Sequence, residues 1–510
     1  MGHTSNLLLD YIKRTPLDAL DAGAVSFYAA YEKVKEISPE IADSILNELR
    51  DQRANLKLIA SENYSSLSVQ MAMANLLTDK YSEGYPYHRF YAGCDNVDKI
   101  EAEAARLACE LFGADHAYVQ PHSGADANMV AFLTILSAKV QRPLMDEMGA
   151  GDVSKMGREE FDKIRDAYGK QRLLALDYYS GGHLTHGYRH NFSSILFDAY
   201  SYTVNRGTNL LDLDELRERL HEVKPLVFMA GYSAYSRKID FAKMRELADE
   251  AGAIFMVDMA HFAGLVAGGA FAGDYDPVPF AHVVTSTTHK TLRGPRGGFV
   301  LCKKEFAEFL DKGCPAFLGG PLPHVLAAKA VAFKEALTPQ FRQYAADITK
   351  NAQAMANAFI KRGVDVLTGG TDNHLMLVDV QKTYGLTGRQ AESALRASGV
   401  TLNRNALPFD ANGPWYTSGL RIGTPAVTTL GMSADEMDEI AAIIDNILRH
   451  TKPAAIQGDA GNAGNVGKAS KASKASKAKF ETEPAVAEGS KGQIKALLSR
   501  FPLYPEIALE

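Results

Sequence analysis

The architecture predicted for this 510-residue chain starts from the stretch Val283-Val-Thr-Ser-Thr-Thr-His-Lys290-Thr-Leu-Arg-Gly-Pro-Arg296-Gly-Gly298. Its β-branched run predicts a buried strand that delivers Lys290 to a turn rich in hydroxyls, arginines and glycines. A lysine amine at a strand end can form a Schiff base with an aldehyde cofactor that also carries a phosphate, provided that its surroundings keep it partly deprotonated. A lone lysine after a strand is usually a surface residue, so this interpretation depends on the neighbouring motifs.

Short apolar strands alternate with helices around this stretch. The predicted strands cover 117–120, 226–230, 254–258, 283–286 and 298–302, and an amphipathic helix from Asp98 to Phe112 is ended by Gly113. This alternation predicts an α/β fold in which helices cover both faces of a mainly parallel sheet, a three-layer α/β/α arrangement. After Pro339 the order helix, strand, helix predicts a second, smaller α/β domain, with its clearest strand at 376–380.

The other segments predict an arm, an insertion and a tail. Residues 1–60 are predicted to be helical, and the Tyr-, Gly-, Pro- and Asn-rich stretch 61–95 predicts an ordered loop rather than a regular element. The low-complexity run of Lys, Ala and Ser cannot offset its ordering entropy, which predicts a linker. The predicted division is an arm and loop at 1–95, a large domain at 96–335 with an insertion at 137–172, a small domain at 336–452, a linker at 453–490, and a docking segment at 491–510.

Composition limits the class of function. The net charge of −6 and the pI near 6.2 argue against a nucleic-acid-binding protein. No apolar run is long enough to cross a membrane, and the N-terminus lacks the layout of a signal peptide. Cys94, Cys109, Cys302 and Cys314 show no paired ligand spacing, so we expect no metal site and reduced thiols in a cytoplasmic protein.

Two motifs could hold a charged cofactor. Ser123 and Gly124 follow a predicted strand and open a helix, where backbone N–H groups and the Ser123 hydroxyl can bind a phosphate; the same pattern is commonly only a helix cap. Asp258 ends a buried strand, and a buried carboxylate needs a cation or several donors. A protonated pyridine nitrogen would serve, and a helix cap is the structural alternative.

Three further motifs add an imidazole, a proton-transfer group and a cation. His183 lies in a glycine-rich loop, free to lie flat against a ring, although a lone loop histidine is commonly solvated. Between residues 81 and 91 several tyrosines surround Glu83, a composition suited to proton transfer in a half-buried site. Arg421, on a short apolar strand, could bind an amino-acid carboxylate through charge-assisted bonds worth roughly 1.5–3 kcal/mol each, or form a structural salt bridge.

Together these motifs resemble the serine hydroxymethyltransferase family, pyridoxal-phosphate enzymes of the aspartate-aminotransferase fold (fold type I). The resemblance runs from about Leu58 to His450. It is carried by Leu58-Ile-Ala-Ser-Glu-Asn-Tyr64, Tyr81-Ser-Glu-Gly-Tyr-Pro86, Gly181-Gly-His-Leu-Thr-His-Gly187, Ser233-Ala-Tyr-Ser236, Val257-Asp-Met-Ala-His261, Thr287-Thr-His-Lys-Thr-Leu-Arg-Gly-Pro-Arg-Gly-Gly298, Gly369-Gly-Thr-Asp-Asn-His-Leu375 and Ser418-Gly-Leu-Arg421.

The resemblance implies a set of cofactor residues. Lys290 would bind pyridoxal 5'-phosphate covalently, Asp258 would pair with the ring nitrogen, and His183 would stack on the ring. The remaining cofactor contacts would come from Ser233 and His261 around the ring oxygen, and from Ser123, Gly124, His289 and Gly320 of a second subunit around the phosphate. Ala125 departs from the family pattern, because a serine hydroxyl is often used for the phosphate there.

The resemblance also implies substrate and folate residues. Arg421, helped by Ser61, would bind the substrate carboxylate. Tyr81, Glu83 and Tyr91 would reach into the neighbouring subunit's site, so a homodimer with shared active sites is expected, and Glu83 would move protons; pairing of dimers into tetramers is left open. The implied tetrahydrofolate contacts are Tyr178, Gly182, Leu184, Asn373, Gly413 and Trp415.

The implied activity is a reversible transfer of the hydroxymethyl group of serine to tetrahydrofolate, giving glycine and 5,10-methylenetetrahydrofolate. A folate-independent aldolase acting on β-hydroxy amino acids with the same cofactor is the alternative reaction. A non-catalytic protein that inherited the fold is a third reading, but it would be expected to lose Lys290, Asp258 or Arg421, and all three are present.

Overall fold

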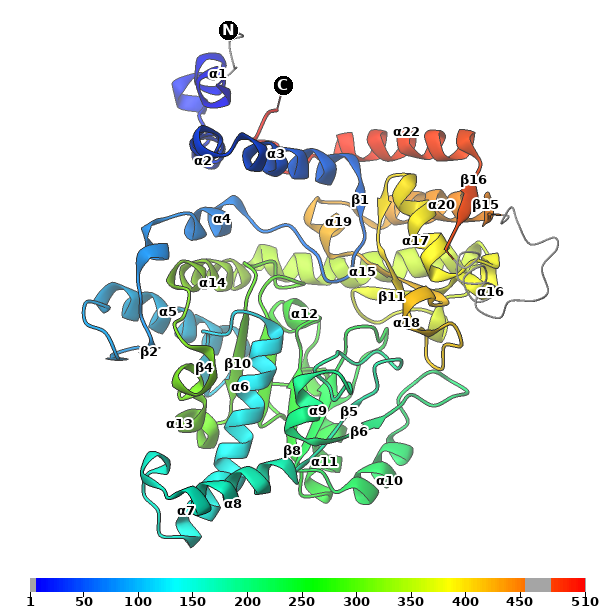
Figure 1. The fold of residues 1–510 in the computed structure, drawn as a ribbon. Coiled ribbons are helices and arrows are strands. Elements are labelled where there is room, and N and C mark those ends of the chain that lie inside the picture. The colour runs from blue at the N-terminus through cyan, green and yellow to red at the C-terminus, as the bar shows by residue number, and fades with distance from the viewer. Residues whose placement is uncertain (1–5, 455–477, 510) are drawn as a thin grey trace, which may run out of the picture.

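The computed structural model describes residues 6–454 and 478–509, apart from the side chains of residues 314 and 315. A large sheet, drawn in green, and a small sheet, drawn in yellow and orange, organise the chain (Figure 1).

The large sheet has seven strands in the order β4-β10-β9-β8-β7-β5-β6. Their bounds are β4 His116–Tyr118, β5 Arg172–Leu176, β6 Asp198–Tyr202, β7 Val227–Gly231, β8 Ile254–Asp258, β9 Val283–Thr287 and β10 Gly298–Cys302. Neighbours from β9 to β6 pair in parallel, whereas β10 runs antiparallel to both β9 and β4. The predicted mainly parallel sheet is confirmed.

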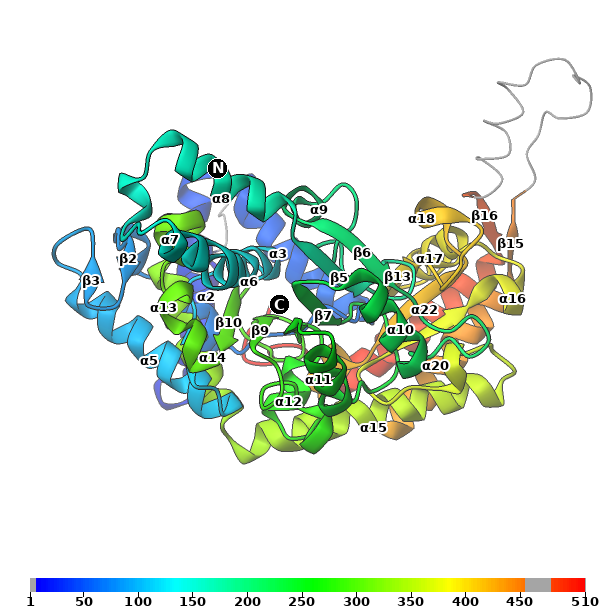
Figure 2. The ribbon, with the colours of Figure 1, turned by 90° about the horizontal axis from the view of Figure 1, so that it is seen from below.

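Helices cover both faces of this sheet (Figure 2). Successive strand residues point to opposite faces, so Phe228 and Ala230 lie in one core while Val227 and Met229 lie in the other. One core is closed by α5 Asp95–Phe112, α10 Leu213–Val223, α11 Phe241–Glu250, α12 Ala263–Ala267 and α14 Pro323–Ala336. The other is closed by α6 Gly124–Leu136, α9 Phe192–Leu196 and α13 Ala307–Leu310.

The small sheet is antiparallel, with the order β11-β14-β13 (Leu375–Asp379, Gly419–Gly423 and Asn403–Asn405). It shares a core with α15 Pro339–Lys361, α17 Gly388–Ala397 and α20 Ala434–Arg449. The short helices α16 Val380–Tyr384, α18 Gly413–Tyr416 and α19 Pro425–Thr429 connect these elements, and β1 Leu56–Lys57 pairs in parallel with β12 Val400–Thr401. The strand expected at 376–380 is β11, which begins one residue earlier.

Two expectations about local structure need correction. The stretch 61–95 is not all loop, because it contains α4 Leu67–Met73. The Ser66 hydroxyl caps α4 by accepting from the Val69 N–H at 3.1 Å, and Val69 packs in one apolar cluster with Ala328 and Ala332 of α14. Strands β5 and β6 were not predicted: the four-residue apolar run Leu173–Leu176 after a helix cannot be told from more helix by periodicity, and β6 is a half-polar edge strand.

The segment 137–172 is helical for most of its length. A π-helical turn, Ser137–Gln141, continues α6 into α7 Arg142–Glu147, and α8 Arg158–Gly169 then leads into β5. The segment therefore extends the α6 side of the large sheet.

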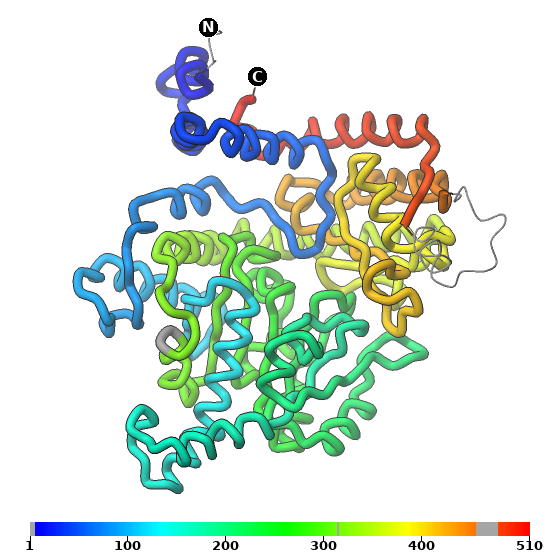
Figure 3. Tube along the Cα trace, viewed as in Figure 1, coloured from blue at the N-terminus to red at the C-terminus, as the bar shows by residue number. Residues whose placement is uncertain are grey.

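The two ends of the described chain pack together. Helices α1 Leu7–Arg14, α2 Ala22–Ile37 and α3 Pro39–Ala54 lie on the same side of the molecule as α22 Pro484–Arg500 (Figure 3). Arg53 donates to the carbonyl oxygens of Leu503, Tyr504 and Ile507 at 2.9, 2.7 and 2.8 Å. Together with Arg14, which donates to the Ala508 carbonyl oxygen at 3.1 Å, this guanidinium ties the last described residues to the N-terminal arm.

Part of the stretch expected to be a linker is regular structure. β16 Phe480–Thr482 pairs with β15 Thr451–Pro453, and α22 begins at Pro484 rather than at 491. α22 buries Ile494, Leu497 and Leu498 in the core of the small sheet, which accounts for its order. The rest of that stretch, 455–477, lies outside the described residues. Among the described helices, none combines the length and apolar character needed to cross a bilayer.

Candidate active site

Two adjoining cavities of about 330 and 340 Å³ open beside the carboxyl ends of β7, β8 and β9. Ligands of parallel α/β sheets bind at this edge, because the chain there leaves the strands in loops. Both cavities are lined by Ser61, His183, Ser233, His261 and Lys290. The predicted lysine and its expected neighbours therefore meet in one place.

Lys290 lies just beyond β9 and lines both cavities. Burial lowers the pKa of Lys290 to about 8, and the positive charges of Arg421 and Arg296 act in the same direction, while Asp258 opposes them. The Asn63 amide donates to the Lys290 carbonyl oxygen at 2.9 Å, which fixes the backbone of the turn. A partly deprotonated amine on a fixed backbone is suited to covalent attachment of an aldehyde.

Asp258 ends β8 and is 8% exposed. Its Oδ2 accepts from Asn128 Nδ2 at 3.0 Å and lies 3.2 Å from His186 Nε2, and its Oδ1 accepts from the Ala260 N–H at 3.0 Å. Burial alone would raise the pKa of Asp258, but the contact with His186 and the charge of Lys290 hold it below its ordinary value. The carboxylate is therefore ionised and faces the cavity, ready for a cationic partner.

His183 is held as a neutral ring. Burial, with a smaller contribution from the neighbouring His186, lowers its pKa to about 4. Its Nδ1 accepts from the Thr185 N–H at 3.2 Å and lies 2.7 Å from the Thr185 hydroxyl, which also accepts from Asn128. The proton of the neutral ring therefore belongs on Nε2. A neutral imidazole can stack on an aromatic cofactor without adding charge to it.

His261 is buried next to a second histidine. Its Nδ1 lies 3.1 Å from His374 Nε2, and the two rings stack with their centroids 5.4 Å apart. Burial lowers the pKa of both rings, that of His374 to about 3. Both rings are therefore neutral, and the N–H of one ring donates to the bare nitrogen of the other.

One part of the second cavity is suited to an anion. Ser123 caps α6 by accepting from the Asp126 N–H at 3.1 Å, so the N–H groups of the first helical turn point outward. Gly124, His289 and Arg296 line the same cavity. A β-carbon on Gly124 would lie 2.7 Å from a Thr287 methyl group, so glycine allows the helix start to lie close to β9.

Arg421 rises from β14 into the first cavity. Its Nη1 donates to the Ser233 carbonyl oxygen at 2.6 Å and its Nε to Asn403 Oδ1 at 3.1 Å, while Nη2 has no partner among the described residues. Burial lowers the pKa of Arg421 to about 10, so the group stays charged at neutral pH. No carboxylate of the described residues forms an ion pair with it, which argues against the structural salt bridge.

Tyr81, Glu83, Tyr91 and Gly320 do not line either cavity of the chain. The ring of Tyr81 lies 3.4 Å from the point where a β-carbon on Gly320 would sit, so these two predicted residues are neighbours at another surface. Tyr81 and Tyr91 are 56% and 49% exposed and pack edge to face. This group is brought together by the fold, but away from Lys290.

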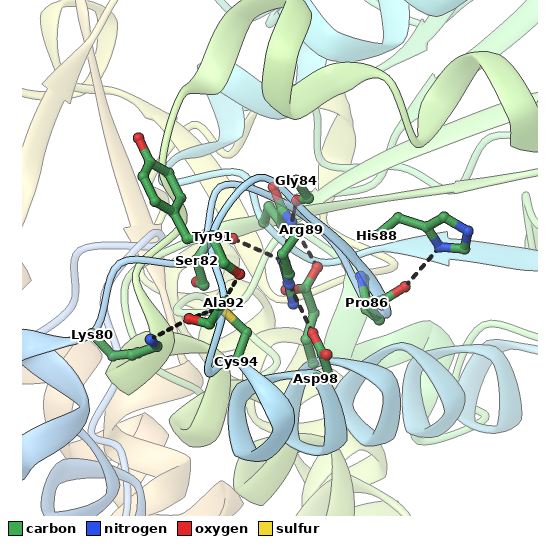
Figure 4. A network of polar contacts seen from close by, with 12 residues as sticks. Lys80, Ser82, Gly84, Pro86, His88, Arg89, Tyr91, Ala92, Cys94 and Asp98 are labelled. Carbon is green, nitrogen blue, oxygen red and sulfur yellow. Dashed lines mark hydrogen bonds and ion pairs between the residues drawn. The ribbon is translucent and has the colours of Figure 1, made fainter.

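A buried network holds the loop that carries Glu83 (Figure 4). Arg89 contacts Asp98 at 2.8 Å and Glu101 at 2.7 Å, and its Nη1 donates to the carbonyl oxygens of Ser82 and Gly84 at 2.9 and 3.1 Å. The guanidinium is only 3% exposed. The loop is therefore braced from the inside of its own chain.

The predicted folate residues divide into two groups. Tyr178, Gly182 and Leu184 line the first cavity, and Pro414 brings the Gly413–Trp415 turn to its edge. Trp415 itself is 61% exposed, between the guanidinium groups of Arg389 and Arg404. Asn373 is fully buried, donates to Tyr232 Oη at 3.1 Å and the Tyr235 carbonyl oxygen at 2.9 Å, and does not line the cavity.

Several site residues were missed by sequence reasoning. Asn128 and Thr185 link the Asp258 carboxylate to His183, but a polar residue inside a helix or loop gives no signal of this. His186, which the sequence offers only as part of the Gly181–Gly187 motif, contacts Asp258. Among the described residues no group of three potential ligands could hold a metal ion, and Cys94, Cys109 and Cys302 are free thiols.

The arrangement fits pyridoxal phosphate. A buried ionised carboxylate, a helix start and a lysine amine of lowered pKa line one cavity, and they match a ring nitrogen, a phosphate and an aldehyde. Neutral His183 completes the set.

Comparisons with known proteins agree with this geometry. The family model described as "Serine hydroxymethyltransferase" matches residues 34–168 and 165–444. A serine hydroxymethyltransferase of Treponema pallidum is 54% identical over 503 residues, covering 99% of this chain and 85% of the relative. Those of Salinispora tropica and Mycolicibacterium smegmatis are 52% and 51% identical, each covering 96% of this chain and 99% and 96% of the relative.

Proposed function

Because the chain belongs to the serine hydroxymethyltransferase family, we propose how its residues divide the work of that enzyme. The reaction is the reversible transfer of the serine hydroxymethyl group to tetrahydrofolate, which gives glycine and 5,10-methylenetetrahydrofolate, and the cofactor is pyridoxal phosphate. When bound, the cofactor supplies an electron sink for the negative charge left at Cα when the Cα–Cβ bond of serine breaks.

In this proposal the chain holds the cofactor at both ends and at its aldehyde. Lys290 attaches it covalently, Asp258 keeps the ring nitrogen protonated, and neutral His183 stacks on the ring. Ser233 and His261 flank the ring oxygen, while Ser123, Gly124 and His289 hold the phosphate. The support is the geometry of the two cavities, in which these residues lie around one volume.

Arg421 orients the amino acid. Its Nη2, free of partners among the described residues, would take one carboxylate oxygen of serine or glycine, and Ser61 across the cavity would take the other. Because Ser233 and Asn403 already fix the guanidinium, little side-chain entropy is lost when the substrate binds.

A second copy of the chain would complete the site. Tyr81, Glu83 and Tyr91 lie outside the chain's own cavities, on a loop braced by Arg89. A homodimer with shared sites would bring Glu83 of one copy to the hydroxymethyl group bound by the other, where it would move protons, and would bring Gly320 to the phosphate. Tyr178, Gly182, Leu184, Asn373, Gly413 and Trp415 would face the folate.

The division into a large domain at 96–335 and a small domain at 336–452 belongs to the same proposal, as does a cytoplasmic location. The support for the division is that each region has its own sheet and that each sheet has its own core, with α15 contributing to both cores.

The meeting of Lys290 with the ionised Asp258 in one cavity carries the proposal. Reductive trapping of the cofactor followed by peptide mapping should place the label on Lys290. Lys290→Ala should lose the label while unfolding at an unchanged temperature. A label on another lysine would contradict the assignment. Tetrahydrofolate should also raise the rate of serine cleavage strongly, whereas equal rates with and without it would favour the folate-independent aldolase.

A further inference from the structure

Lys329 is a buried cation that the proposed reaction does not use. It lies on α14, its side chain is 1% exposed, and it belongs to the largest fully buried side chains of the chain. Lysine is rarely buried to this degree unless its charge is compensated. No carboxylate of the described residues forms an ion pair with it.

The Lys329 ammonium instead donates three hydrogen bonds to backbone carbonyl oxygens. Its Nζ lies 2.6 Å from the oxygen of Val119, 2.9 Å from that of Pro121 and 2.8 Å from that of Gly298. An ammonium has three N–H groups and a neutral amine only two, so three acceptors match the protonated form. Burial lowers the pKa of Lys329 to about 7, and the carboxylates of Glu101 and Asp126 oppose this.

These carbonyls lie where the edge of the large sheet ends. β4 and β10 pair up to Tyr118 and Val300, and the ladder then stops before Pro121, which has no N–H to donate. Beyond this point the Gly298 N–H still donates to the Pro121 carbonyl oxygen at 2.9 Å. A buried carbonyl left without a partner costs about 1–3 kcal/mol, and Lys329 donates to this oxygen and to those of Val119 and Gly298.

The same carbonyls belong to the two segments that form the phosphate end of the cavity. Val119 and Pro121 lead into Ser123 and Gly124, and Gly298 follows Gly297, whose N–H donates to His289 Nδ1 at 3.4 Å. A β-carbon on Gly297 would lie 2.6 Å from Lys329 Cε, and one on Gly298 would lie 2.3 Å from the Ser123 carbonyl oxygen. Glycines at both positions let the two segments close around the ammonium.

We infer that Lys329 is a positioning residue for the phosphate cradle: its ammonium ties the 119–124 and 297–298 segments together so that Ser123, Gly124 and His289 converge on one anion. Its positive charge contacts the two segments that would hold a dianion and adds to the field of the α6 N-terminus. This compensates for Ala125, which brings no hydroxyl to the phosphate. The inference rests on the proposed function, because it takes the anion to be the phosphate of the cofactor.

The test compares the binding of pyridoxal phosphate and of pyridoxal to the cofactor-free protein, followed by absorbance. Pyridoxal carries the aldehyde and the ring but no phosphate. For Lys329→Met we expect the dissociation constant for pyridoxal phosphate to rise at least about 10-fold, with that for pyridoxal changed less than about twofold; a tenfold change corresponds to 1.4 kcal/mol. Inorganic phosphate should also compete less well with pyridoxal phosphate in the variant.

Lys334→Met is the matched control, because Lys334 lies on the same helix but is exposed. It loses the same charge and should keep the ratio of the two dissociation constants. Lys329→Gln keeps two N–H donors and should give an intermediate ratio, which tests the idea should the methionine variant not fold.

An unchanged ratio in folded Lys329→Met or Lys329→Gln protein would overturn the inference, as would equal weakening for both ligands. Failure of both variants to fold would also count against it, because Lys329 would then serve the fold as a whole. If the unsubstituted protein binds neither ligand at Lys290, the proposed function itself fails, and that outcome is distinct from these.

Discussion

Replacement of Arg421 by lysine tests the carboxylate site most directly. The substitution keeps one positive charge but removes the planar fork. The guanidinium donates to Ser233 and Asn403, and Nη2 remains for the substrate. A lysine amine at this place cannot satisfy both protein acceptors and still present a donor of the same geometry to a carboxylate.

The expected loss follows from one charge-assisted hydrogen bond. Such a bond contributes about 1.5–3 kcal/mol, and 1.4 kcal/mol corresponds to a factor of ten in affinity. Arg421→Lys should therefore weaken serine and glycine binding by about 10- to 150-fold. Any cost of the unpaired Asn403 oxygen is already present in the free variant, so it should appear in the unfolding temperature rather than in the binding constant.

The assay is equilibrium titration of the loaded enzyme with serine and with glycine, alongside tetrahydrofolate binding measured separately. Folate affinity should change far less than amino-acid affinity. Arg404→Lys is the matched control: Arg404 lines the same cavity but is committed to Glu392, so serine affinity should change less than about twofold. Serine affinity in Arg421→Lys within about twofold of the unsubstituted enzyme would refute the assignment of the carboxylate site.

Two other predictions concern pH and stability. Because the pKa of Lys290 is about 8, the rate at which added pyridoxal phosphate attaches to the cofactor-free protein should depend on pH. The rate should rise about tenfold per pH unit below pH 8, as the amine loses its proton, and level off above pH 8. Stopped-flow absorbance would measure this rate, and a flat profile from pH 6 to 9 would contradict the prediction. Arg89→Met leaves Glu101 buried without its cation, so it should lower the free energy of unfolding, measured in urea titrations, by about 3–5 kcal/mol. The control is Arg106→Met at an exposed position on the same helix as Glu101, which should lower it by less than about 1 kcal/mol. Equal losses in the two variants would show that the buried ion pair contributes no more to stability than the exposed one.

Much of the fold and of the cofactor end of the site can be predicted from the sequence, because the signals there are local. The β-branched run before Lys290 predicts β9, and the apolar run before Asp258 predicts β8; parallel strands then bring both residues to one edge of the sheet. The role of Arg421 is predictable for a similar reason, because a single charge on an apolar strand must meet either a counter-ion or a ligand. The interactions of the residues beside them cannot be predicted from the local sequence.

The rest depends on contacts between distant segments. Asn128 looks like an ordinary polar residue of α6, yet it joins Asp258 to Thr185 across 130 and 57 residues of sequence. In the sequence Lys329 resembles an exposed lysine of a surface helix. Its burial is explained only by the carbonyl oxygens at the end of the β4–β10 ladder, to which it donates. The helix α4 was missed for the same reason, because its stability comes from packing on α14 rather than from its short sequence.

The buried charges around Arg89 bear on the proposed shared site. A loop that only closed its own chain would not need an arginine with a side chain just 3% exposed, since an apolar side chain of similar volume often stabilises as well. Arg89 instead fixes the backbone of Ser82 and Gly84 on either side of Glu83, with Tyr81 and Tyr91 left exposed. A loop held rigid before it meets its partner loses less entropy on association. This supports the proposal that Glu83 acts in a second copy, and it implies that Arg89→Met should weaken the dimer more than it weakens cofactor binding within one chain.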